Sequence, residues 1–219
     1  MNKKCQISIF IIIGIITILV IAFLLYITDV IADKNSLDFT PYPDVRNNIE
    51  SAHKKSLECS SYTIGKFGGF SEFKDVGLAE IDNSRLLAGE LMTWIISNII
   101  NLSSLEEKGY TIKQGKIKTD IILAKNNIAA DTLHELDVVK IGSEKTKLEK
   151  FHVDDDIRYN HIYNYANAQH KEEDISLNNL ADTDFHADVF VIKNMSIFVF
   201  TDPESMIDQN PFKFIFWKK

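Results

Sequence analysis

An uninterrupted apolar segment near the N-terminus constrains this chain more than any other feature. From Ile7 to Ile27 no residue is charged, and sixteen of the 21 positions are Ile, Leu, Val or Phe. As an α-helix this segment rises about 31 Å, which matches a hydrocarbon core of roughly 30 Å. In hydrocarbon a single segment satisfies its backbone hydrogen bonds only as a helix. The sequence therefore predicts a transmembrane helix over 7–27 that attaches the chain to the lipid bilayer.

The charges that flank this segment predict its orientation. Two lysines precede it directly, whereas Asp29 and Asp33 follow it. Because positive residues are retained on the cytoplasmic side, we expect a cytoplasmic N-terminus and an extracytoplasmic C-terminal region at the cell membrane. Pro41 and Pro43 would break a helix and mark a linker. The expected organisation is a short tail (1–6), the transmembrane helix (7–27), a linker (28–43) and one extracytoplasmic domain (44–219).

A cleaved secretory signal is the alternative interpretation of the same segment. Val30-Ile31-Ala32 is an imperfect small-residue cleavage site, and cutting there would release the domain. The apolar core of a signal peptide spans about 7–15 residues, however, which is shorter than this run. A retained anchor is the preferred interpretation.

Charge and cysteine content narrow the function classes. The net charge is −7 and the lysines are scattered among acidic residues, so we expect no nucleic-acid partner. In the expected topology Cys5 and Cys59 lie on opposite sides of the membrane and should not pair. Cys59 falls within a helical pattern and is interpreted as a small buried residue, with an intermolecular disulfide as the alternative.

Helical spacing dominates the first part of the external region. Asp44 can cap a helix to about Ile64, and Gly65 would end it. A second helix is expected from about Asn83 or Ser84 to Asn101, followed by one short turn over 103–108. Its apolar content, which includes Leu87, Leu91, Trp94, Ile95 and Ile99, predicts a core helix. Gly68-Gly69 is interpreted as a turn. The expected apolar stripe of the first helix consists of Val45, Ile49, Ala52, Ser56, Cys59 and Thr63.

Short apolar runs and alternation replace the helical spacing after Gly109. Candidate strands lie at 110–113, 116–124, 128–133, 136–141 and 147–153, then at 189–192, 195–200 and 212–217. Between the two groups we expect a helix over 157–170 and an exposed loop over 170–184. Phe212, Phe214 and Phe216 should share one packed face. The predicted fold class is α+β: the transmembrane helix, then two helices and a mostly antiparallel β-sheet with one further helix.

The sequence identifies no catalytic residue, cofactor or metal site. The local grouping of His152, Asp154 and Asp156, joined by His161, offers too few ligands at fixed spacing for structural zinc, so capping and surface roles are favoured. Nucleophile-elbow, phosphate-loop and dinucleotide patterns do not occur. The sequence does not decide whether the chain is an enzyme, and a non-catalytic role is favoured.

Two tripeptides match the acceptor pattern for N-glycosylation, which is meaningful only outside the cytoplasm. Asn101-Leu102-Ser103 sits at an expected helix end, where it should be accessible. Asn194-Met195-Ser196 lies in or beside an expected strand and is interpreted as a chance match.

The leader also permits a family comparison. Lys4-Cys5-Gln6-Ile7-Ser8-Ile9-Phe10, continued by the residues at 11–15, resembles the N-termini of uncharacterised archaeal single-pass membrane proteins from small-genome lineages, whose leaders look like class III, pilin-type signal peptides. The likeness extends to short motifs at 48–52, 65–70, 197–202 and 212–216. It implies location and architecture, not chemistry. Phe10 stands where pilin-type leaders have glutamate, which argues against filament assembly.

Together these features favour a non-catalytic surface or envelope protein whose domain binds partner proteins or associates laterally. The alternatives are a pilin-like filament subunit processed before Gln6 and an anchored hydrolase.

Overall fold

The computed structural model describes residues 42–70, 77–171 and 184–218. The expected transmembrane helix, the cytoplasmic tail and most of the linker and of the 170–184 loop lie outside these residues. Within them, none of the helices has both the length and the apolar character needed to cross a bilayer. Pro43 to Lys219 make up one compact unit.

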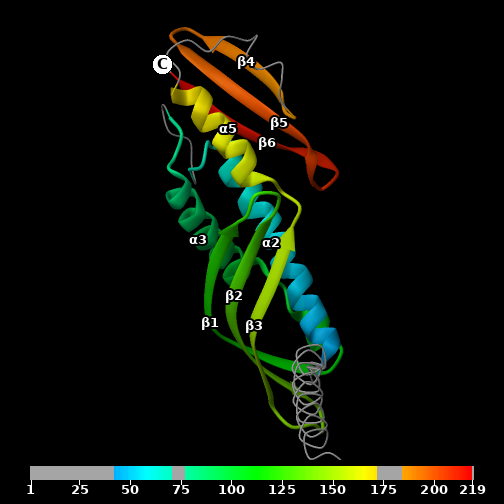
Figure 1. Ribbon diagram of the computed structural model, residues 1–219. Coiled ribbons are helices and arrows are strands. Elements are labelled where there is room, and N and C mark those ends of the chain that lie inside the picture. Colours follow the sequence, from blue (N-terminus) through cyan, green and yellow to red (C-terminus); the bar gives the residue numbers. More distant parts are fainter. Residues whose placement is uncertain (1–41, 71–76, 172–183, 219) are drawn as a thin grey trace, which may run out of the picture. The chain divides into compact units, whose positions relative to one another are not determined.

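The class predicted from sequence, α+β, is confirmed. Two antiparallel sheets of three strands, ordered β1-β2-β3 and β4-β5-β6, combine with four helices in the described residues (Figure 1). The elements are α2 (Pro43–Lys66), α3 (Ile81–Ile99), α4 (Ser103–Glu106), β1 (Tyr110–Leu123), β2 (Ile128–Lys140), β3 (Thr146–Asp155), α5 (Tyr159–Lys171), β4 (His186–Ile192), β5 (Met195–Ile207) and β6 (Asn210–Lys218).

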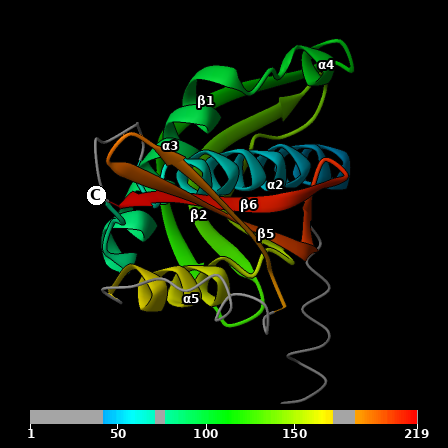
Figure 2. The same ribbon diagram turned by 90° about the horizontal axis from the view of Figure 1, so that it is seen from above.

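Helix α2 packs against strands of both sheets, β3 in the first and β6 in the second, and runs alongside β6 in Figure 2. It begins at Pro43, which was expected in the linker, because proline is tolerated in the first turn of a helix, where its missing N–H has no intrahelical acceptor. The expected stop at Gly65 is wrong, since the helix continues to Lys66. A Cβ at Gly65 would lie 2.5 Å from Cζ of Phe212, so this glycine allows β6 to approach.

The buried face of α2 departs from the expected stripe after its second turn. Val45, Ile49 and Ser56 are buried as predicted, but His53, Leu57 and Ile64 form the rest of the face. The prediction that Cys59 is buried is wrong, because its side chain is exposed and its thiol is free. Leucine and isoleucine remove more apolar area from water than cysteine and threonine do, which favours the observed face.

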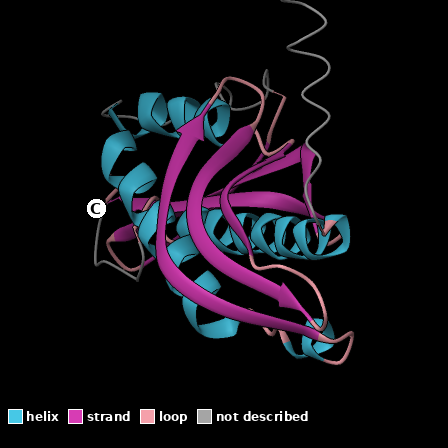
Figure 3. Ribbon diagram, turned by 90° about the horizontal axis from the view of Figure 1, so that it is seen from below, coloured by secondary structure: helices cyan, strands magenta, loops and turns pink. Residues whose placement is uncertain are grey.

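Three long strands form the first sheet where five short ones were expected. β1 continues through Gly115, and its pairing with β2 shifts between Gln114 and Ile117. The pairing of β2 with β3 shifts between Leu133 and Leu136, at the same level of the sheet. Such β-bulges bend a strand without ending it, and Figure 3 shows the curvature. Gly115, which separates the candidate strands 110–113 and 116–124, therefore lies at a bulge within one strand and not at a turn between two.

The second sheet presents an aromatic face to the helices. Phe212, Phe214 and Phe216 are fully buried, which confirms the predicted alternation of the last strand. The ring of Phe216 stacks on Phe198 at 4.9 Å between centroids, and Tyr159 of α5 meets Phe214 edge-on at 5.7 Å. These rings belong to one hydrophobic core that also includes side chains of α2, α3 and the first sheet.

An ion pair joins Arg158, the residue directly before α5, to the buried Asp202 at a bulge in β5. Arg158 Nε donates to Asp202 Oδ2 at 3.0 Å, and Ser205 Oγ donates to the same oxygen at 2.6 Å. Burial by itself raises the pKa of Asp202, but the hydrogen bonds from Arg158, Ser205 and the Glu204 backbone outweigh it and hold this pKa below its ordinary value. The pair lies at the bulge between Asp202 and Met206, through which β5 continues beyond its expected end at 200 to Ile207.

The aromatic face should dominate stability. We expect Phe214→Ala to lower the free energy of unfolding by about 3–5 kcal/mol, because truncating a fully buried phenylalanine leaves a cavity. Phe190→Ala, at a side chain that is 54% exposed in the same sheet, is the matched control and should change it by less than about 0.5 kcal/mol. Urea denaturation followed by tryptophan fluorescence measures both. Equal losses in the two variants would contradict the assigned packing.

Candidate functional site

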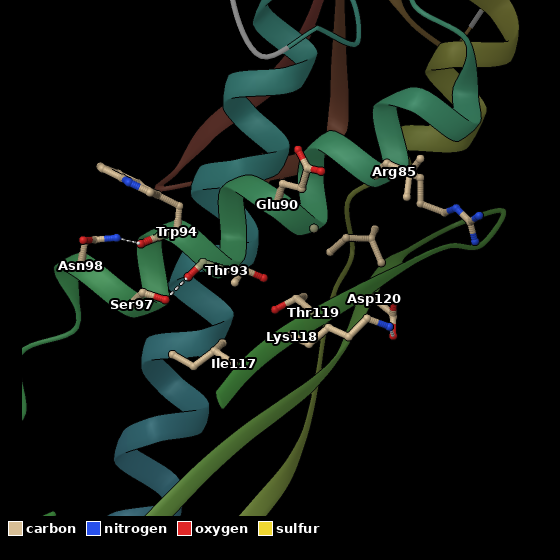
Figure 4. A pocket seen from close by; sticks show the side chains of 13 residues that line it. Arg85, Glu90, Thr93, Trp94, Ser97, Asn98, Ile117, Lys118, Thr119 and Asp120 are labelled. Carbon is tan, nitrogen blue, oxygen red and sulfur yellow. Dashed lines mark hydrogen bonds and ion pairs between the residues drawn. The ribbon is translucent and has the colours of Figure 1, made fainter. Parts of the chain in front are cut away.

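A groove between α3 and the edge strand β1 is the leading candidate site (Figure 4). Its volume is about 630 Å³, within the size range of ligand pockets. Gly89 brings the two elements together, because a Cβ there would lie 2.8 Å from the carbonyl oxygen of Thr119. In Figure 4 Arg85 lies at one end of the groove and Asn98 at the other.

The backbone of β1 presents an open edge to this groove. β1 pairs only with β2 among the described strands. The Ala124 N–H donates to Asn127 O at the hairpin turn, and in an antiparallel ladder inward and outward residues alternate from there. Leu123, Ile121, Thr119 and Ile117 thus form the outward set. Leu123 O indeed accepts a hydrogen bond from Asn160, and Thr119 O faces Gly89.

The side chains of α3 give the groove an apolar rim. Trp94 is 57% exposed and Leu86 60% exposed, so the apolar surface of α3 extends beyond the face that packs in the core. Ser97 and Asn98 donate hydrogen bonds to the carbonyls of Thr93 and Trp94, each at 2.8 Å, and are thereby tied to their own helix. Met92, Ile95 and Ile96 are buried, as expected for a core helix, whereas Trp94 on a neighbouring face is not.

Charges of both signs line the groove. Lys118 Nζ lies 3.1 Å from a carboxylate oxygen of Asp120, and Arg85 lies 3.6 Å from Asp82, all on exposed side chains. Exposed pairs of this kind contribute little to stability. Since Arg85 and Lys118 are balanced by Asp120 and by Glu90, which also lines the groove, the site does not select a strongly charged ligand.

The histidine grouping noted in the sequence is not assembled into a site. His152 Nδ1 lies 2.7 Å from Asp131 on the exposed face of the first sheet, and His161 lies 3.8 Å from Asp184. In the described ranges no three His, Cys, Asp or Glu side chains are close enough to share a metal ion. His152 and His161 therefore have different partners.

Sequence reasoning missed a buried histidine pair between α2 and β2. His53 Nε2 lies 3.0 Å from His134 Nδ1, and the stacked rings have centroids 5.2 Å apart, with Phe151 edge-on to His53. Both side chains have no exposed surface. Their spacing was the available signal, since His53 follows Ile49 by four residues and His134 alternates with Leu136.

Burial controls the ionisation of this pair. Desolvation, with the charge of His134 in second place, lowers the pKa of His53 to about 3, and desolvation lowers the pKa of His134 to about 4. The pair is therefore neutral in the folded protein near neutral pH, with one ring donating to the other. Its place is structural, because neither residue lines the groove.

Both glycosylation acceptor patterns fall in exposed connections. Asn101 Oδ1 accepts a hydrogen bond from the backbone N–H of Ser103 at 2.9 Å, just before α4. Asn194 is exposed in the turn between β4 and β5. Exposure makes both asparagines accessible to modification.

Comparison with known proteins gives no information on function. No protein-family model matches the chain, and no curated protein or solved structure matches it either.

The histidine pair predicts acid sensitivity. Because both folded pKa values lie below the unfolded value near 6.5, the unfolded state binds protons first and stability is lost as the pH falls below about 6.5. Each histidine contributes up to about 1.4 kcal/mol per pH unit, so the pair can remove up to about 5 kcal/mol by pH 4.5.

Urea denaturation at pH 7.5, 6.5, 5.5 and 4.5 measures this loss. The double variant His53→Leu/His134→Leu replaces both partners with apolar groups and should flatten the profile over this range. A profile equally steep in the double variant would show that other groups cause the acid sensitivity.

Proposed function

We propose that this protein is a membrane-anchored, non-catalytic binding domain outside the cytoplasm, and that it takes an extended segment of a partner protein into the α3–β1 groove. The observation that carries the proposal is the open backbone edge of β1 beside an exposed apolar rim. Strand addition uses these features, because backbone hydrogen bonds supply affinity and side-chain contacts supply specificity.

The outward backbone groups set the geometry of the bound segment. Ile117 lies on one side of the point where Gly89 meets Thr119, and the edge near Ile117 is the stretch available for pairing, because Ile121 on the other side is 3% exposed and packs in the core. A segment paired with the stretch near Ile117 would place alternate side chains toward Trp94. An apolar residue at that position is the favoured ligand feature, since the rim charges balance.

Other features support a binding role over a catalytic one. Catalytic sites concentrate strongly shifted pKa values in a cleft. The strongest shifts toward lower pKa here belong to His53 and His134, which are buried away from the groove. The groove side chains Ser97 and Asn98 are instead tied to helix carbonyls.

The anchored location rests on the sequence at 7–27 and its flanking charges. Membership of the archaeal anchored group is part of the same proposal and rests on the short motifs of the leader and of the last strand. An anchor in the membrane would hold the groove outside the cytoplasm, where segments of other surface proteins are available.

The groove can be tested with a displayed library of random ten-residue peptides selected on the whole chain in detergent. Trp94→Ala removes the apolar rim, and Ile117→Pro removes an outward N–H without removing an inward one. We expect selected peptides to lose about tenfold or more in affinity with either variant, by isothermal titration. Ile99→Ala, at another exposed apolar residue of α3 that does not line the groove, is the control and should bind normally.

A library that yields no peptide, or peptides that bind both groove variants as well as the parent, would refute the groove as the binding site.

The anchor predicts the fate of the leader. We expect the chain in the membrane fraction to retain residues 7–27, either uncut or starting at Gln6, because the apolar run is too long for an ordinary signal core. Intact mass and N-terminal sequencing measure this. A soluble form starting at Asp33 would contradict the anchor, and recovery of the chain in filaments would favour the pilin-like alternative.

A further inference from the structure

A second open sheet edge lies on β4, away from the α3–β1 groove. β4 pairs only with β5 among the described strands. Its last three residues are apolar and exposed: Phe190 at 54%, Val191 at 73% and Ile192 at 52%. Neighbouring residues of a strand point to opposite faces, so this end of β4 is apolar on both sides.

Edge strands of monomeric proteins are normally protected by charges, proline or bulges, and an exposed apolar edge is a template for pairing. β4 carries a single carboxylate, Asp188, and neither proline nor a bulge interrupts its pairing with β5. Lys193 follows in the turn and balances Asp188. The edge is therefore locally neutral on a chain of net charge −7, so two copies can meet here without the repulsion that opposes contact elsewhere.

We propose that β4 pairs antiparallel with β4 of a second copy of this chain, which joins two three-stranded sheets into one of six strands. A two-fold axis perpendicular to the sheet keeps equivalent residues on the same face. Directly opposed residues of paired strands point to the same face of the sheet. With this two-fold axis, that condition holds only in registers where one residue lies opposite the same residue of the other copy. Centring on Phe190 places Val189 opposite Val191, and centring on Val189 pairs the whole strand. In both registers Asp188 faces an apolar residue and never its own counterpart.

The size of the edge limits its strength. Seven residues span about 23 Å, and a strip of this length buries much less than the roughly 800 Å² per partner of a stable interface. The pairing is therefore weak in free solution. Confinement in one membrane raises the effective concentration, and this step alone rests on the proposed anchor.

Disulfide cross-linking of the whole chain in membranes tests the pairing. In a background of Cys5→Ser and Cys59→Ser, we expect Phe190→Cys or Val189→Cys to give a covalent dimer on mild oxidation, because the residue at the two-fold axis faces its own copy. The yield should exceed by about tenfold that of Ile141→Cys, which lies next to the end of β2 and is 86% exposed. Adding Val191→Lys should abolish the dimer, since both copies then carry an extra positive charge at the edge.

Yields no higher than the Ile141→Cys control would overturn the proposal. Cross-linking of β4 only to a cysteine placed at Ile117 of a second copy would also overturn it, because the contact would then be head-to-tail. Membrane recovery of each variant is measured in the same samples, so a chain that is not anchored is distinguished from an anchored chain that does not pair. The peptide-binding result is independent of both.

Discussion

Helix α2 covers an apolar face of each of two small sheets, and the rest of the described structure depends on this shared packing. A three-stranded sheet gains independent stability only when one of its faces is buried. The first half of α2 covers the first sheet through His53 against His134, and its last turns cover the second sheet through Gly65 against Phe212. Because the two contacts lie on one rigid helix, both sheets share a single core.

Packing of α2 on the faces of the sheets does not satisfy the backbone hydrogen-bonding groups at the sheet edges. Three of the four edges accept a hydrogen bond from outside their sheet: Arg46 donates to the Lys150 carbonyl on β3, Asn160 to the Leu123 carbonyl on β1, and the Gly77 N–H to the Trp217 carbonyl on β6. Neither β1 nor β4 has a second strand partner among the described residues. The two proposed interaction surfaces are these two edges. Both exist because the core is built by covering the faces of the sheets and not by extending their edges.

Sequence periodicity predicted the helices well and the strands less well, for physical reasons. The alternation of Phe212, Phe214 and Phe216 identifies a buried face directly, because large aromatic side chains have few stable places in water. A bulge at Gly115 and a turn at Gly115 produce the same local pattern, so only the pairing with β2 distinguishes them. The burial of Cys59 was predicted wrongly because helical spacing alone does not distinguish a face through Cys59 from the observed face through Leu57 and Ser60.

The candidate groove could not be predicted from sequence, since no motif marks it. It arises where Gly89 lets α3 approach Thr119, two residues that are distant in the chain and ordinary in type. The periodic pattern placed Trp94 in a core helix, and only the packing of α3 shows that its side chain is exposed. The same holds for the histidine pair, whose partners are 81 positions apart.

Amide hydrogen exchange of β1 in the free protein tests the central claim most directly. If the edge is open, the N–H group of Ile117 should exchange quickly, while those of Lys118 and Asp120, which face β2, should be protected. Such a difference between neighbouring amides of one strand requires a partner on one side only. Equal protection of all three amides would contradict the account, because it would mean that the edge of β1 already has a partner.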